Sequence, residues 1–321
     1  MKTIRFGRTN VQVPTVSLGT WGHSGETMSA RGESVGWSGH DDAQASEAIF
    51  AAWQNGITHW DTADVYGNGR AEGLIGRQWE RVPRRDVFLA SKVGWDSGEY
   101  AHFYHPKQMR RQIERSLRNL RTDVIDLYYL HHCDFGPKDE HFDDALDTMH
   151  RFREEGKYRF LGLSDWDSDR IMKFIDRVRP DAVQPYRNVI DDPWESSGLR
   201  AWVEKNDIGV AFFSPIRHGL LLGKYDEPKQ FPEGDFRSNI KAFGDPAAIA
   251  KMKDAAAALR VRFKDHPEPV LHGVLGALLA DAPTATVLLG QRNPKQVEAA
   301  AKVGEALSGE EAAWVKSVYV S

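Results

Sequence analysis

The sequence predicts a single α/β domain folded as a closed (β/α)8 TIM barrel. Eight short apolar runs recur along the chain, and most are followed by a segment whose apolar residues repeat with the helical period. Near-continuous apolar runs are typical of parallel strands that are buried on both faces. Alternating strands and helices can also form a doubly wound open sheet, but the G-x-G-x-x-G turn of that fold is missing after the first run. We therefore expect the barrel and keep the open sheet as the alternative.

The positions of the apolar runs give the expected elements. Strands are expected at residues 15–19, 57–60, 87–91, 125–130, 158–163, 181–184, 208–213 and 285–289. Helices are clearest at residues 107–120, 143–155 and 169–178, where apolar side chains step by three and four. The whole chain, residues 1–321, is expected to form one barrel domain.

Additions to the barrel are expected at both ends and after several strands. Residues 3–13 have the pattern of a β-hairpin with its turn at 7–10, and we expect it to cover the barrel floor. A helix at 309–318 exceeds what the barrel needs. Long loops are expected at residues 23–42, 94–106 and 224–246. Loops of this length in a compact domain are usually functional, so we expect them to close over a ligand.

Composition excludes several classes of protein. The chain carries 42 basic and 46 acidic residues, a net charge of −4 that disfavours nucleic-acid binding. Its one cysteine excludes an internal disulfide and a cysteine-cluster metal site. The N-terminus has no apolar leader, and the longest apolar stretch, 270–280, is shorter than the roughly 20 residues that span a bilayer. A cytoplasmic protein is expected.

Polar side chains follow nearly every expected strand. In a barrel the carboxyl ends of the strands meet on one face, where active sites lie. The titratable residues at these positions are Asp61, Tyr66, Lys92 and His131. We therefore expect these four residues to lie together although they are distant in the sequence.

These four residue types together suit proton transfer. A tyrosine hydroxyl has a pKa of about 10 in water, and a neighbouring ammonium group would lower it. Asp61 would keep the Lys92 ammonium charged and in place beside Tyr66, and His131 could bond the substrate oxygen. The set could protonate a carbonyl or deprotonate an alcohol, while a cofactor would supply or accept the hydride.

Two other chemistries lack support in the sequence. The run His131-His132-Cys133-Asp134 contains metal-ligand types, but neighbours on an extended chain point to opposite faces, so no metal site is expected. Cys133 is expected to be a small buried residue. A serine hydrolase is unsupported because the G-x-S-x-G motif is absent.

The sequence resembles the aldo-keto reductase family, and in particular its bacterial long-chain branch, from Leu18 to Gln296. Residues 61–72 are similar to the family signature D-T-A-x-x-Y-G-x-G-x-x-E. Lys92 and His131 match the family lysine and histidine, and residues 214–225 resemble S-P-L-x-x-G-x-L-x-G-K-Y.

The resemblance implies an extended NADPH or NADH bound without a dinucleotide-binding fold. It implies that Tyr66 is the general acid, that Lys92 and Asp61 tune it, and that His131 orients the substrate. The implied cofactor-binding residues are Gly19, Thr20, Ser164, Asp165, Gln184, Phe213, Ser214, Ile216, Gly219, Gly290, Arg292 and Gln296.

Departures from the family pattern concern the cofactor. Asp165 replaces the usual asparagine, and we hypothesise that its charge favours the oxidised, cationic nicotinamide. Phe213 replaces a frequent tyrosine and keeps a stacking face, whereas Ala299 and Ala300 replace polar residues that often contact the adenine. Arg292 could bind a 2′-phosphate bidentately, which favours NADPH over NADH.

The expected substrate is a small carbonyl compound or alcohol, in a pocket lined by Trp21 and Trp95. Three functions fit these residues: a carbonyl reductase, a sugar or alcohol dehydrogenase working in the oxidative direction, and a cofactor-bound regulatory subunit. The same residues serve both reaction directions, so the sequence leaves the direction, the substrate and the oligomeric state open.

Overall fold

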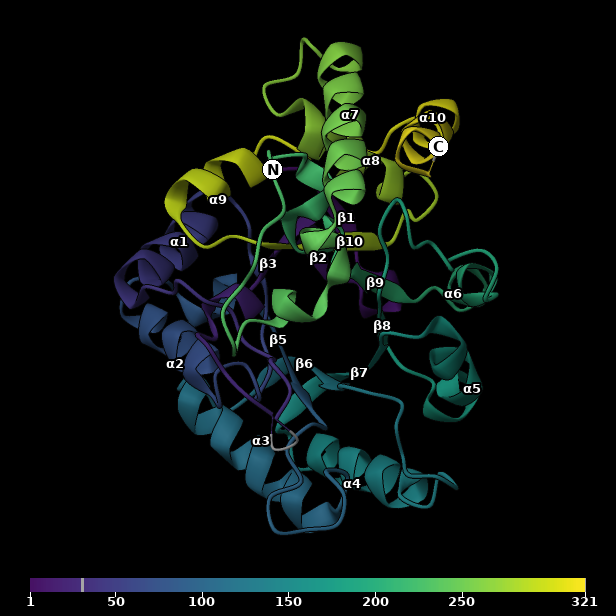
Figure 1. Cartoon of the computed structure of the whole chain (residues 1–321). Helices are drawn as coiled ribbons and strands as arrows, with labels where there is room; N and C mark the ends of the chain where they lie inside the picture. The colour runs from purple at the N-terminus through teal and green to yellow at the C-terminus, as the bar shows by residue number, and fades with distance from the viewer. Residues whose placement is uncertain (30–31, 321) are drawn as a thin grey trace.

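The computed structural model, which describes residues 1–29 and 32–320, shows a closed barrel of parallel strands surrounded by helices (Figure 1). The strands are β3 (Val16–Gly19), β4 (His59–Asp61), β5 (Phe88–Val93), β6 (Ile125–Leu130), β7 (Tyr158–Asp165), β8 (Ala182–Pro185), β9 (Gly209–Phe212) and β10 (Ala285–Gly290). Each pairs with the next in parallel, and β10 closes the barrel onto β3. The barrel prediction is confirmed.

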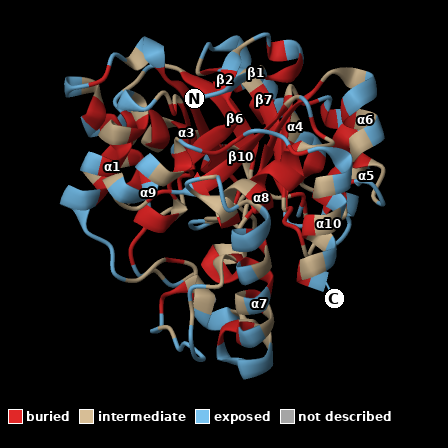
Figure 2. Ribbon diagram, turned by 90° about the horizontal axis from the view of Figure 1, so that it is seen from above, coloured by how far each residue is buried: buried red, intermediate tan, exposed pale blue. Residues whose placement is uncertain are grey.

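The helices lie outside the strands (Figure 1). They are α1 (Asp42–Gln54), α2 (Arg70–Gly76), α3 (Pro106–Leu120), α4 (Phe142–Glu154), α5 (Ser168–Val178), α6 (Leu199–Asn206), α7 (Pro246–Arg262), α8 (Pro269–Leu279), α9 (Pro294–Ala300) and α10 (Gly309–Val320). Figure 2 shows buried residues over the strands and inward helix faces, with exposed residues outside. The expected helices correspond to α3, α4, α5 and α10.

The N-terminal hairpin covers the floor of the barrel, as expected. Its strands β1 (Thr3–Arg5) and β2 (Gln12–Pro14) pair antiparallel, and Phe6 is fully buried against Phe88 at the start of β5. Gly209 at the start of β9 is needed for this contact, because a Cβ there would lie 2.6 Å from the Phe6 ring. The opposite end of the barrel is therefore left for the long loops.

Two long loops join one another above that open end. Phe236 N–H donates to the Gly36 carbonyl at 2.9 Å, and Asp235 accepts from the backbone and hydroxyl of Ser38 at 2.8 and 2.6 Å. Residues 30–31, part of the expected loop 23–42, lie outside the described residues. These bonds join the loop before α1 to the loop before α7, so the two loops together cover the open end of the barrel.

None of the described helices combines the length and the apolar character needed to cross a membrane.

Candidate active site

The barrel brings Asp61, Tyr66, Lys92 and His131 to one place. Lys92 Nζ donates to Asp61 Oδ1 at 2.6 Å and to the Tyr66 hydroxyl at 3.3 Å, and it also bonds the Thr62 carbonyl at 2.7 Å. Asp61 ends β4, whereas Lys92 lies inside β5, which runs two residues further than expected. The four residues that were expected to lie together are therefore neighbours in the structure.

Burial and neighbouring charges together set the charge states of Lys92 and Tyr66. Burial alone would lower the pKa of Lys92, but Asp61 and Tyr66 outweigh it and raise the pKa above its ordinary value. Burial also raises the pKa of Tyr66, and Lys92 only partly opposes this. Lys92 lowers the pKa of Tyr66, as expected, but desolvation of the phenolate is the larger effect, so the pKa of Tyr66 lies above its ordinary value. Tyr66 is a protonated donor near neutral pH.

His131 is a neutral ring beside the Tyr66 phenol. The two ring centroids are 6.0 Å apart at 77°, and the backbone N–H of His131 donates to the Val93 carbonyl at 2.8 Å. Burial, helped by His132 and Lys92, holds the pKa of His131 well below its ordinary value. A neutral imidazole carries one N–H donor and one acceptor, so His131 can donate to an oxygen without adding charge.

The side chains of His131 and His132 do not point to opposite faces, which corrects the expectation from an extended chain. Their rings are parallel within 5° and 4.6 Å apart. Strand β6 ends at Leu130, so the alternation of a strand no longer applies to these two residues. Within residues 1–29 and 32–320, no three His, Cys, Asp or Glu side chains are grouped to hold a metal ion.

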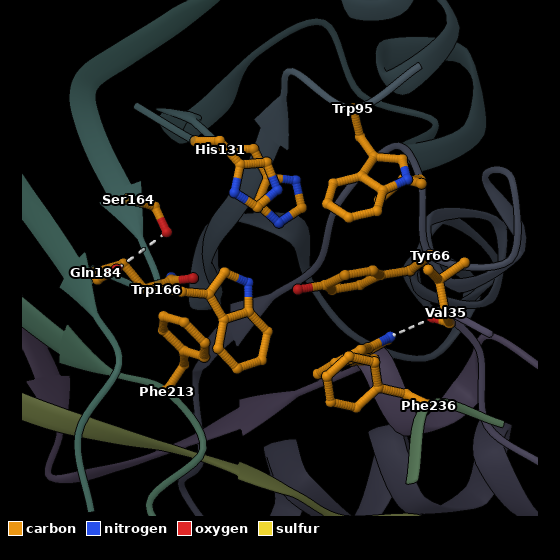
Figure 3. Close-up of a pocket in the computed structure, with 12 residues that line it drawn as sticks. Val35, Tyr66, Trp95, His131, Ser164, Trp166, Gln184, Phe213 and Phe236 are labelled. Carbon is orange, nitrogen blue, oxygen red and sulfur yellow. Dashed lines mark hydrogen bonds between the residues drawn. The ribbon is translucent and has the colours of Figure 1, made fainter. Parts of the chain in front are cut away.

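A pocket opens above these residues, and aromatic rings form most of its wall (Figure 3). Its lining consists of Trp21, Val35, Val65, Tyr66, Trp95, His131, His132, Ser164, Trp166, Gln184, Phe213 and Phe236. Trp21 and Trp95 lie where the sequence placed them. Val35, Val65, His132 and Trp166 were not expected there, because loop closure rather than a local pattern brings them in.

Ser164, Gln184 and Phe213, which were expected at the nicotinamide, line this pocket. Ser164 Oγ donates to the Gln184 carbonyl at 3.0 Å, and Gln184 Nε2 donates to Asp61 Oδ2 at 2.8 Å. Asp165, the last residue of β7, accepts from the backbone N–H groups of Cys133 and Asp167 at 2.7 and 2.9 Å. Its carboxylate therefore holds the main chain just after β6, at Cys133, and just after β7, at Asp167.

The other expected cofactor residues lie along the rim. Thr20 Oγ1 donates to the Asp61 carbonyl at 2.9 Å, and Gly19 pairs with Gly290 across β3 and β10. Ser214, Ile216 and Gly219 lie in and after the turn that follows β9, outside the pocket lining. Of the two alanines expected near the adenine, Ala300 is fully buried in the core and cannot contact a ligand there.

Arg292 lies beyond β10 and reaches the first long loop. Its Nη2 donates to the Ser38 carbonyl at 2.8 Å, and its backbone N–H donates to Gln296 Oε1 at 2.7 Å. Burial and the charge of Arg237 lower the pKa of Arg292. Arg292 is therefore held by a main-chain carbonyl, and Asp235, whose charge also acts on Arg292, forms its ion pair with Arg237.

Lys224 and Arg237 are cations that sequence reasoning did not single out for this site. Lys224 is half-buried, and burial together with Arg237 and Arg292 lowers its pKa. Its ammonium lies close to Gly219, where a Cβ would be 3.2 Å from Nζ. The position of Lys224 in the 214–225 motif was the available signal. The charges of Lys224, Arg237 and Arg292 act on one another, and the buried Asp235 carboxylate offsets only part of the total positive charge. The three side chains therefore suit a polyanionic ligand.

Comparisons with known proteins identify the family of this chain. A sequence model of the aldo/keto reductase family matches residues 15–320, so the chain belongs to that family of oxidoreductases. Aldo-keto reductase YhdN of Bacillus subtilis is 29% identical over 94% of this chain and 88% of its own length. The NADH-specific methylglyoxal reductase of Escherichia coli is 27% identical over 74% of each chain.

Solved structures share the barrel fold of this chain. The glycerol dehydrogenase of Gluconobacter oxydans has a TM-score of 0.80 and 28% identity, covering 98% of this chain and 94% of that one. An aldo/keto reductase of Klebsiella pneumoniae, solved with NADP and acetate, has a TM-score of 0.70 and 24% identity, with 99% and 95% coverage.

Proposed function

We propose that this protein is an NADP(H)-linked reductase that interconverts a small carbonyl compound and an alcohol. The observation that carries this proposal is the bonded set Asp61–Lys92–Tyr66 beneath an aromatic pocket that His131 also lines. A bound nicotinamide would supply the hydride in the reductive direction and accept it in the oxidative one.

The side chains of this protein would supply the proton and stabilise the phenolate that remains after its transfer. The raised pKa of Tyr66 keeps its hydroxyl protonated, so it can donate to a carbonyl oxygen as that oxygen gains negative charge. Lys92 lies 3.3 Å from the same hydroxyl and stabilises the phenolate that is left, while Asp61 holds Lys92 in position. His131 would donate to the substrate oxygen and orient it.

The chain also fits the phosphates of the cofactor. Lys224, Arg237 and Arg292 form a cationic strip next to the turn that contains Gly219. Arg292, which is held by a main-chain carbonyl, would bind a 2′-phosphate, and this supports NADPH over NADH. Relatives carry both preferences in their names: one from Schizosaccharomyces pombe, 32% identical over 62% of this chain, is designated for NADP(+), and the Escherichia coli reductase for NADH.

Consumption of NADPH in the presence of aldehydes, ketones and sugars, followed by absorbance, tests the proposal. We expect turnover with at least one compound, and slower turnover with NADH. The same protein incubated with NADP+ and alcohols measures the oxidative direction. Tight cofactor binding without turnover on any of these compounds would instead support the regulatory-subunit alternative.

A further inference from the structure

Trp166 is a partly exposed tryptophan inside the candidate active site. It directly follows Asp165 at the end of β7, lines the same pocket as Tyr66, and is 37% exposed. Figure 3 shows its indole projecting into the middle of the pocket, between Phe213 and the Tyr66 hydroxyl in this view. Exposed tryptophans are unusual because the indole is mostly apolar, so this position calls for an explanation.

The indole spans the two walls of the pocket. On one side its centroid lies 4.8 Å from the Phe213 ring at 88°. On the other side it lies 6.1 Å from Trp21 and 5.7 Å from Phe236. Trp21 in turn stacks on Tyr66 within 17° at 6.1 Å. The indole of Trp166 therefore already occupies the space between Phe213 and the stacked rings of Trp21 and Tyr66.

The polar groups around the same space are bonded within the protein. Ser164 Oγ and Gln184 Nε2 donate to a backbone carbonyl and to Asp61, as described above. Ser164, Gln184 and Phe213, which were expected to meet the nicotinamide, therefore line the same pocket as the Trp166 indole.

We propose that Trp166 is a built-in competitor of the nicotinamide: its indole occupies the nicotinamide subsite and must swing away before the cofactor ring can lie against Phe213. This inference rests on the proposed function. If the indole is rotated out of the subsite in only a fraction of the molecules, the apparent affinity for the cofactor is reduced to that fraction of its intrinsic value. Trp166 would thus set cofactor affinity without contacting the phosphates.

The backbone around Trp166 favours a side-chain rotation over a loop movement. Asp165 binds the N–H of Cys133 on one side and the N–H of Asp167 on the other, and Asp167 caps α5 through the N–H of Asp169. These bonds fix the main chain before and after Trp166. The indole has no hydrogen bond to break among the contacts that the structure gives it, so rotation costs only its ring contacts.

Dissociation constants measured by isothermal titration calorimetry test this inference, because the readout does not depend on turnover. We expect Trp166→Ala to bind NADPH about tenfold more tightly than the wild type, a difference of about 1.4 kcal/mol, because the variant has no ring contacts to break before the cofactor binds. Trp166→Phe, which keeps a smaller ring, should lie between the two.

Trp314→Ala is the matched control. Trp314 lies on α10 and packs against Phe263 at 6.3 Å, outside the pocket lining, so its removal takes away a tryptophan without freeing the subsite. Its affinity for NADPH should stay close to that of the wild type. Equal or weaker NADPH binding by folded Trp166→Ala overturns the inference while leaving the proposed function intact. No binding of NADPH or NADH by any folded variant overturns both.

Discussion

Gln184 Nε2 lies 2.8 Å from Oδ2 of Asp61, the carboxylate whose other oxygen receives the Lys92 ammonium. Asp61 is almost fully buried, so these two donors replace the water that its charge would otherwise need. The bond links a residue proposed for the cofactor to the residues proposed for proton transfer. A change at Asp61 or Lys92 should therefore affect folding as well as chemistry.

Lys92→Met should destabilise the protein by about 3–5 kcal/mol, because it leaves the Asp61 carboxylate buried without its cation. Urea unfolding measures the loss. The double variant Asp61→Asn/Lys92→Met removes both charges and should be more stable than the sum of the two single changes predicts. Strict additivity would show that the two side chains are not energetically coupled.

Arg292→Ala and Lys224→Ala should weaken NADPH binding by about tenfold or more, since hydrogen bonds to charged groups contribute about 1.5–3 kcal/mol. Arg292→Ala should leave NADH binding nearly unchanged, because NADH lacks the 2′-phosphate. Titration with both cofactors gives the two constants. Lys302→Ala, a change of an exposed lysine near the end of α9, is the control. An equal loss for both cofactors in Arg292→Ala would remove the argument for NADPH preference.

Asp165→Asn should shift the ratio of affinities for oxidised and reduced cofactor toward the reduced form, because it removes a negative charge that favours the cationic ring. It should also lower stability by about 1–3 kcal/mol, since an amide oxygen cannot replace both carboxylate acceptors that bind Cys133 and Asp167. Cofactor titrations and urea unfolding measure the two effects. If the affinity ratio does not change, the charge hypothesis is wrong.

His59 should make the protein sensitive to acid. Burial, followed by the charge of Lys92, lowers the pKa of His59 to about 3. The unfolded chain takes up this proton near pH 6.5, so lowering the pH from about 6.5 toward 3 favours unfolding by up to about 1.4 kcal/mol per pH unit.

Unfolding free energies measured between pH 7 and pH 5 test this dependence. His59→Gln should show a shallower fall in stability with decreasing pH than the wild type. His150→Gln changes an exposed histidine on α4 and should leave the slope unchanged. Parallel slopes for wild type and His59→Gln would contradict the prediction.

The barrel could be predicted from the sequence because its strands are short apolar runs with helical segments between them. The four clustered residues could be predicted because each lies at or near the end of such a run. The parallel rings of His131 and His132 could not, since they depend on how the chain turns after β6. Trp166 follows the end of β7 and Lys224 lies in the 214–225 motif, but the positions of their side chains in the site depend on loop conformation and side-chain rotation.

The central claim is that Tyr66 donates the proton, and Tyr66→Phe tests it most directly because it removes only the hydroxyl. Turnover of NADPH with the best carbonyl substrate is measured for wild type and variant, beside the dissociation constant for NADPH. Loss of a positioned acid should lower kcat by about 10²–10⁴-fold while the NADPH dissociation constant stays nearly constant. A variant that turns over at the wild-type rate would contradict the role assigned to Tyr66.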